Sequence, residues 1–383
     1  MIFRHQTIPE PAESLIFDAH KLKLNTHLTR SSQAQRILLN LDLVDYIVSL
    51  FKENEPVSYK IHEPKVLKKF QLYCLSKLSA ETLSELQNGS RNHERLADSI
   101  MEQLEVSAKY RHLVLDAVAQ MCKFYSDLKL YEEKCNIPLS ENILQHQKLF
   151  LSTWSSLTEK RPPESLRACR HDDEDTWGYL GFQTPLSDFR RTGLLGLMSL
   201  EHMVASYPEL SRRTLATSRS LSNASSNASA EAAGPSGPPR PSESETWLPF
   251  ALVSINVTSW VMDFYNENEL NAFSYNNDYD PLETFYLLHA SFFFNFINFY
   301  MAKGPVSVLE FNRVAAEYKG ELLNKLKQLY EIKDKVDSAY GTNLVNYLQS
   351  ELETFNLSTN YYTHYEIKIN MGRWKTWSKM YTG

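Results

Sequence analysis

The sequence has few of the residues that build metal sites or disulfide frameworks. Its 383 residues include four cysteines, which form no Cys-x-x-Cys pair. No histidines stand at the spacing of zinc ligands either. We therefore predict reduced thiols that pack in the interior, and no metal site. The four thiols are Cys74, Cys122, Cys135 and Cys169.

An excess of positive charge is also missing. Lysine and arginine together number 40 against 46 aspartate and glutamate residues, which gives a formal net charge of -6. No broad basic surface is then available to neutralise a phosphate backbone. The composition therefore argues against nucleic-acid binding.

Apolar runs of the kind that enter membranes are absent too. The first residues carry proline and glutamate where a secretory signal would be apolar. The longest apolar run, residues 285–301, is broken by His289, Asn295 and Asn298, which are costly in hydrocarbon. We expect a buried helix there, in a cytoplasmic protein that does not cross a membrane.

The common motifs of self-contained active sites are missing as well. The sequence contains no Walker GxxxxGK[ST] loop, no GxGxxG after a strand, no HExxH and no GxSxG elbow. An intrinsic nucleotidase or hydrolase activity is therefore poorly supported.

Apolar residues at helical spacing, in contrast, are abundant. One stripe covers residues 39–50 and another covers 311–329. Similar patterns between them predict an all-α fold. Two segments would also suit strands, because Ala251–Val257 is rich in β-branched residues and Tyr361–Ile369 alternates with aromatic ones. The further helices are expected near residues 64–85, 93–104, 108–134, 140–157, 192–206, 250–266 and 281–302.

Residues 211–246 differ from the rest in composition. They are rich in serine, alanine, proline and glycine and have almost no large apolar side chains after Leu221. Such a segment buries too little to fold, so we predict a disordered insertion within a domain. Its Pro238–Pro241 stretch could present a polyproline helix to an SH3 domain. Short proline runs are, however, common in flexible insertions without a ligand role.

Residues 177–197, WGYLGFQTPLSDFRRTGLLGL, form the most unusual stretch. Polar Gln183, Asp188 and Arg190 stand there between aromatic and glycine anchors. An Asp-x-Arg pair beside Trp177 and Phe182 is commonly a structural ion pair packed on aromatic rings. Residue chemistry alone therefore favours a structural role over catalysis.

This stretch resembles the signature of the ELMO (engulfment and cell motility) domain. The resemblance continues in PFALVSINVTSWV, residues 249–261, and in VLEFNRVAAEY, residues 308–318. It implies an all-helical ELMO domain over residues 93–335, with its core at about 140–330. The remaining parts are then an N-terminal helical region, residues 1–92, and a C-terminal aromatic extension, residues 336–383.

The short, arginine-bearing members of this family stimulate Arf-like GTPases. Their pattern is similar to W-x3-GFQ-x3-P-x-T-DFRG-x-G-x-LGL, and its arginine is the catalytic finger. The resemblance places that role on Arg190. A planar, permanently charged guanidinium suits it, because phosphoryl transfer spreads negative charge over several oxygens. GTP and Mg²⁺ would belong to the partner, so no cofactor of this chain is implied.

The same resemblance suggests supporting residues around the arginine. Asp188 could orient the Arg190 backbone or pair with its side chain, and Gln183 could position a water or the loop. The remaining supporting residues are Trp177, Phe182, Phe189, Arg191 and Gly193.

Two departures from the family pattern stand out. Only Thr184 separates Gln183 from Pro185, where the family has three residues. Arg191 replaces a glycine, which matters if that position needs a positive φ, and it could add a second cation.

The expected partner is therefore an Arf-family GTPase in its GTP form, which would bring the protein to membranes peripherally. The rival interpretation is a non-catalytic adaptor or effector that binds a small GTPase or a cytoskeletal or engulfment regulator. The acidic run at residues 172–175 could steer a basic partner surface, or be merely solvated.

Overall fold

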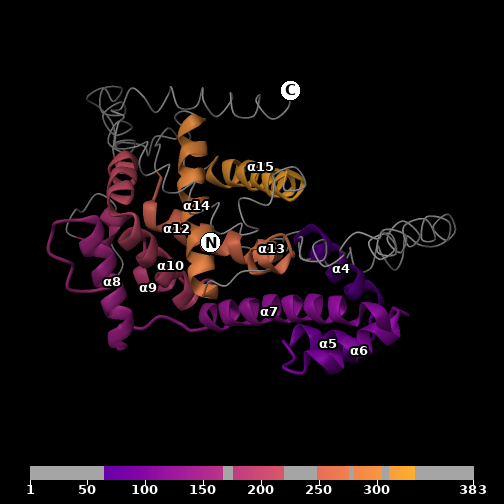
Figure 1. The fold of residues 1–383 in the computed structure, drawn as a ribbon. Helices are drawn as coiled ribbons and strands as arrows, with labels where there is room; N and C mark the ends of the chain where they lie inside the picture. Colours follow the sequence, from indigo (N-terminus) through magenta and orange to yellow (C-terminus); the bar gives the residue numbers. More distant parts are fainter. Residues whose placement is uncertain (1–63, 167–175, 220–247, 276–279, 304–309, 333–383) are drawn as a thin grey trace, which may run out of the picture. The chain divides into compact units, whose positions relative to one another are not determined.

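The computed structural model describes residues 64–166, 176–219, 248–275, 280–303 and 310–332 (Figure 1). All regular elements within these ranges are helices, which confirms the all-α prediction. They are α4 (Pro64–Lys77), α5 (Ala80–Gln87), α6 (His93–Gln103), η1 (Ala108–Tyr110), α7 (Arg111–Cys135), α8 (Leu144–Leu157), η2 (Trp177–Leu180), α9 (Pro185–Asp188), α10 (Gly193–Ser206), α12 (Phe250–Asn266), α13 (Asn271–Ser274), α14 (Pro281–Ala302) and α15 (Phe311–Ile332).

Polar residues mark several helix starts as capping chemistry requires. The side chains of Ser79 and Asn92 accept the backbone N–H of the third residue that follows, at the starts of α5 and α6. Asp280 accepts from two N–H groups at the start of α14, where Pro281 occupies the first helical position. These bonds satisfy donors that have no partner inside the helix.

The core forms around α10, which packs on α7, α8, α12 and α14. Both α12 and α14 are apolar on almost every side and are buried accordingly. The β-branched segment Ala251–Val257 lies inside α12, so burial outweighs its strand propensity. The apolar run 285–301 lies inside α14, as predicted. None of the described helices is long and apolar enough to span a membrane.

The two described helices before residue 93, α4 and α5, belong to the same packing unit as the later ones. Contacts join α4 to α7, α13 and α15, and α5 to α6 and α7. At the centre of the α4 contact is Gln71, which is fully buried. Its Nε2 donates to Tyr125 at 3.0 Å, and its Oε1 accepts from Asn271 at 2.7 Å. The expected boundary near residue 92 therefore does not divide the described helices into separate packing units.

The first residues of the expected insertion are helical. Helical backbone covers residues 208–219, nine of which had been assigned to the disordered segment 211–246. Leu215 is buried, and the hydroxyls of Thr214 and Ser218 donate to the Leu210 and Leu248 carbonyls. Serine and threonine can be buried in a core when their hydroxyls donate hydrogen bonds to backbone carbonyls. A prediction based only on the number of large apolar residues overlooks this.

Several expectations fall on residues outside the described ranges. These are the apolar stripe 39–50, Cys169, the acidic run 172–175, the remaining insertion with Pro238–Pro241, and the aromatic extension 336–383. The three described cysteines are free. Burial raises the pKa of the Cys74 thiol to about 12 and those of Cys122 and Cys135 to about 11, so these thiols stay protonated at neutral pH.

Candidate functional site

An aromatic cluster anchors the segment that contains Arg190. Phe150 and Trp154 come from α8, and Trp177, Phe182 and Phe189 come from the segment itself. Ring centroids lie 5.2 Å apart for Trp154 and Trp177 and 6.0 Å apart for Phe150 and Phe189. All five side chains are buried. The three aromatic residues predicted as supporting are therefore packing residues, and each contributes stabilisation of about 1.5–3 kcal/mol through burial.

Two glycines let this segment approach its neighbours closely. Gly181 has φ +91°, and a Cβ there would lie 2.7 Å from the backbone nitrogen of Phe250. Gly193 has φ +49°, and a Cβ there would lie 2.6 Å from the Ile137 carbonyl oxygen. That oxygen instead accepts the N–H of Leu194 at 3.0 Å, which joins the start of α10 to the end of α7. Only glycine meets both requirements without strain.

Asp188 closes the turn ahead of the arginine. Its Oδ2 accepts the backbone N–H groups of Gln183 at 2.8 Å and Thr184 at 3.0 Å. Helix α9 has four residues, starts at Pro185 directly after Thr184 and ends at Asp188. The carboxylate thus holds a short turn in place of the longer family loop. Of the two roles considered for Asp188, the geometry agrees with backbone orientation, and the described ion pairs include none between Asp188 and Arg190.

Arg190 lies on the surface immediately after α9. Its backbone N–H donates to the Ser187 carbonyl at 3.1 Å, which keeps the main chain in a tight turn. Its side chain is exposed. No ion pair or side-chain hydrogen bond joins the guanidinium to another residue of the described ranges. The group can therefore reach a partner without first breaking an internal bond.

Arg191 differs from its neighbour. Its Nη2 donates to Oδ1 of Asp263 on α12 at 2.8 Å. The expectation of a second available cation is therefore corrected, because this guanidinium is already paired. Among the described residues only Glu105 and Asn268 are non-glycine positions with positive φ, so Arg191 occupies the family's glycine position without that strain.

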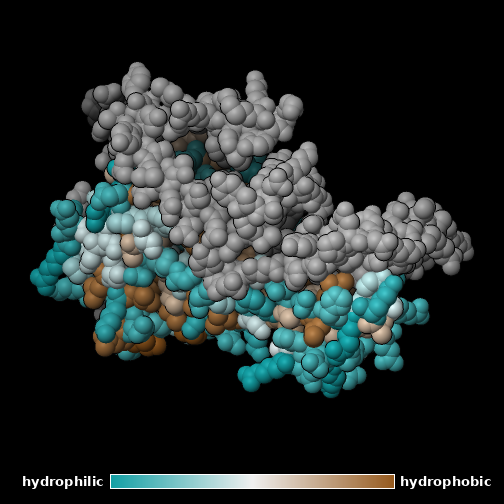
Figure 2. Space-filling model, viewed as in Figure 1, coloured by the Kyte–Doolittle hydropathy of each residue, from teal (hydrophilic) through white to brown (hydrophobic). Residues whose placement is uncertain are grey.

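An exposed apolar row lies on α8, beside the aromatic cluster. Leu144 is 62% exposed, and Ile143 and Leu151 are also exposed. Figure 2 shows apolar side chains gathered at the lower left, where α8 lies in Figure 1. Leu151 follows Phe150, whose ring contacts Phe189 next to Arg190. Helix α8 therefore packs against the arginine turn with its buried side chains and exposes apolar side chains on another face.

Comparison with known proteins identifies the domain that contains this turn. Residues 129–315 match the ELMO/CED-12 family, and they include the whole 177–197 stretch. This match, over just under half of the chain, is to an ELMO domain. The predicted resemblance is thereby confirmed, and Arg190, Arg191 and Asp263 all lie within the matched part of the chain.

Three relatives show how far the likeness to ELMO proteins extends. ELMO domain-containing protein B of Dictyostelium discoideum is 26% identical over 292 residues, which covers 72% of this chain and 92% of the relative. ELMO domain-containing protein 1 of Pongo abelii is 26% identical over 199 residues, covering 50% of this chain and 56% of the relative. ELMO domain-containing protein 2 of Bos taurus is 24% identical over 211 residues, covering 54% and 60%. No solved structure matches the chain.

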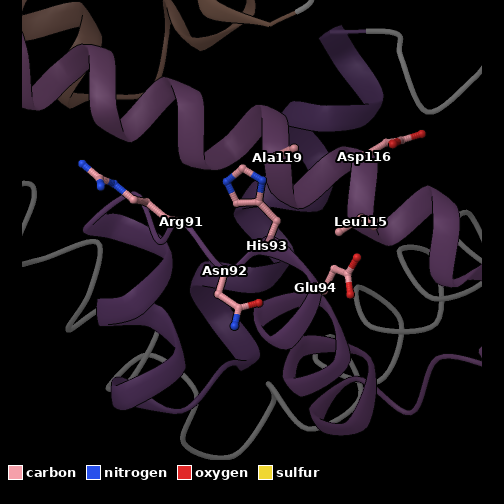
Figure 3. Close-up of a pocket in the computed structure, with 7 residues that line it drawn as sticks. All are labelled: Arg91, Asn92, His93, Glu94, Leu115, Asp116 and Ala119. Carbon is pink, nitrogen blue, oxygen red and sulfur yellow. The ribbon is translucent and has the colours of Figure 1, made fainter.

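A surface hollow of the same unit lies far from the ELMO signature. It has a volume of about 570 Å³ and is lined from the start of α6 and from one face of α7 (Figure 3). Its nearest α7 residue, Ala119, is 16 residues before Cys135, whose carbonyl borders Gly193. At 1.5 Å per residue that separation is about 24 Å. The lining mixes both charge signs, as Arg91 and His93 stand with Glu94 and Asp116.

Sequence reasoning missed the partner of Arg191 and the exposed row of α8. Asp263 is 72 residues from Arg191 along the chain and carries no motif that marks it. Ile143 and Leu144 precede or begin an amphipathic helix, where apolar residues usually face a core. Neither feature is readable without the packing of α8 and α12 against the turn. Among the described residues, no group of three or more histidine, cysteine, aspartate or glutamate side chains is arranged to hold a metal ion.

Proposed function

We propose that this ELMO-domain protein is a GTPase-activating protein for an Arf or Arf-like GTPase, and that Arg190 supplies the arginine finger. The proposal is supported chiefly by the contrast within one turn. Asp188, Arg191 and Gly193 are each committed to internal contacts, whereas the Arg190 guanidinium is exposed and unpaired among the described residues. The family resemblance names the same residue independently of its surroundings.

The chemistry asked of such an arginine is electrostatic. In GTP hydrolysis negative charge spreads over the γ-phosphoryl oxygens and the leaving oxygen, and a guanidinium can contact two of them at once. In a closed, water-poor site an arginine finger accelerates hydrolysis by about 10³- to 10⁵-fold, which corresponds to about 4–7 kcal/mol of barrier. GTP and Mg²⁺ are held by the partner in this proposal, and this chain contributes only Arg190 and the surface around it.

Rigidity of the turn is the second support. A charged group accelerates a reaction most when its supporting backbone does not have to be ordered during the reaction. The aromatic cluster, the Asp188 bonds and the contact between Gly193 and α7 restrain the main chain on both sides of Arg190. The side chain is then the only part that has to move.

A non-catalytic adaptor remains the second candidate, and the exposed apolar row of α8 favours it. Ile143, Leu144 and Leu151 could be buried by a protein partner without any role for Arg190. The two candidates share a docking surface and differ only in whether the arginine reaches the phosphates. They are therefore separated by hydrolysis rates and not by binding.

The test is single-turnover hydrolysis by a panel of Arf and Arf-like GTPases loaded with GTP. We expect the wild-type chain to accelerate at least one of them, and Arg190→Ala to lose that acceleration by about 10³-fold or more. Arg190→Lys should not restore it, because an ammonium lacks the planar fork. Arg91→Ala is the matched control, since Arg91 is also exposed but lines the distant hollow. Binding to the panel with unchanged hydrolysis would instead identify an adaptor.

A further inference from the structure

The position after the proposed finger is occupied by a residue that makes an ion pair of its own. Arg191 reaches Asp263 across the surface between the turn and α12, with 2.8 Å between Nη2 and Oδ1. Short members of the family resemble this chain in the surrounding pattern but have glycine at this position. A glycine cannot make the contact, so this ion pair is a property of this chain's own residues.

We propose that the Arg191–Asp263 ion pair sets the direction in which Arg190 leaves the turn, which makes Asp263 a positioning residue for the GTPase-activating reaction. This inference rests on the proposed function. The main chain is bonded on both sides of the pair of arginines, by Arg190 N–H to Ser187 and by Thr192 N–H to Phe189 at 3.0 Å. Arg191 adds a side-chain attachment on the outer surface of the same turn.

Charge neutralisation is the second part of the argument. Two neighbouring guanidinium groups repel one another and compete for the same anionic target. Asp263 pairs with one of them and leaves the other available, so the turn presents a single unpaired cation among the described residues. Without Asp263 either arginine could be drawn towards the phosphates, and only one of them starts from the productive position.

The helix that carries Asp263 is well anchored. Most of α12 is buried, and the turn that follows it is bonded to α4. Lys68 on α4 pairs with Glu269 at 2.6 Å, and Gln71 on α4 donates to Asn268 at 3.1 Å. An attachment to Asp263 therefore restrains Arg191 against a rigid element and not against a mobile loop.

The Arg191–Asp263 ion pair is partly exposed to solvent, so an effect on the position of Arg190 can be measured separately from an effect on stability. The Arg191 side chain is 70% exposed and the Asp263 side chain 35% exposed. Surface pairs of this kind contribute little to the free energy of folding. Variants that break the pair should therefore fold, and any change in stimulated hydrolysis then reports the aim of Arg190.

The experiment compares Asp263→Asn, Arg191→Gln, the double variant and the charge swap Arg191→Asp with Asp263→Arg. Single-turnover hydrolysis is measured against increasing activator, using the GTPase that wild type stimulates and Arg190→Ala abolishes. We expect each single variant to lower the maximal rate by about 5- to 20-fold with the half-saturating concentration changed less than about twofold. The double variant should be no slower than either single one, and the charge swap should recover most of the loss.

Other outcomes would overturn the inference in distinguishable ways. An unchanged or faster Asp263→Asn variant would show that the pair does not aim the finger. A loss on Arg191→Gln alone would show that Arg191 itself contacts the partner. A lowered melting temperature that accounts for the lost rate, with no recovery in the charge swap, would assign the pair to stability. If the wild-type chain stimulates no GTPase, the proposed function fails first and the positioning role fails with it.

Discussion

Neighbouring residues of the turn have different roles because their side chains make different contacts. Arg190 and Arg191 have the same charge and adjacent backbones, yet one is unpaired among the described residues and the other is bonded to α12. Asp188, which the sequence pairs naturally with Arg190, instead accepts two backbone N–H groups. Asp188 is the last of the four residues of α9, and it satisfies two N–H groups that come just before this helix and have no acceptor within it.

Gly193 offers the sharpest test at this scale. An alanine there would need φ near +49° and would press its Cβ against the Ile137 carbonyl. We expect Gly193→Ala to lower the free energy of unfolding by at least about 1–3 kcal/mol. Gly320→Ala is the matched control, because nothing lies within 4 Å of a Cβ there and the residue is inside α15. That change should stabilise by about 0.5–1 kcal/mol. Urea unfolding of both variants measures the difference, and equal effects would contradict it.

The elements are held together by apolar contact with a few buried polar bonds. Within the pair α12 and α14, His289 is fully buried and its Nε2 lies 3.1 Å from both the Ser254 carbonyl and the Ser254 hydroxyl. Such bonds fix which face of one helix meets the other, since leaving the ring without any partner would be costly. The histidine thus belongs to the packing contact between these two helices.

Burial of His289 makes the α12–α14 contact sensitive to acid. Desolvation lowers its pKa from 6.5 to about 4, so the folded protein binds fewer protons than the unfolded chain between these values. Its contribution is fully present above pH 6.5 and is lost as the pH falls towards 4. When the pH falls from 7.5 to 5.5, we expect the depressed pKa of this residue to lower the free energy of unfolding by about 1–1.5 kcal/mol. Urea titrations at the two pH values test this, and His289→Gln should show a shallower loss. An equal loss in the variant would assign the dependence to other groups.

At the scale of the whole molecule, all the described helices belong to the larger of two packing units, residues 62–383. The division lies about thirty residues before the boundary suggested by the resemblance. Helices α4 and α5 contribute buried Leu67, Phe70 and Leu86 to the larger unit. Gln71 adds buried hydrogen bonds to α7 and α13. The ELMO core is therefore covered by helices that precede it.

Two fragments of the chain distinguish these boundaries. A fragment that begins at residue 62 should unfold cooperatively, because it retains the whole larger unit. A fragment that begins at residue 93 loses three large buried side chains, each contributing about 1.5–3 kcal/mol, and leaves polar groups of α7 and α13 without partners. That loss is comparable with the whole stability of a typical domain, so we expect the second fragment to be largely unfolded or aggregated. Circular dichroism melts compare them, and equal melting temperatures would contradict the assignment of α4 and α5.

Local sequence patterns determined the helical class, most helix positions, the buried apolar run in α14 and the stretch that marks the ELMO domain. These depend on neighbours along the chain, since helical spacing, caps and glycine-containing turns act over a few residues. Only the tertiary structure decided that Arg191 pairs with Asp263, that α4 joins the later helices and that one side of α8 stays exposed. The first two outcomes depend on contacts between residues 72 and 200 positions apart, which no local periodicity encodes.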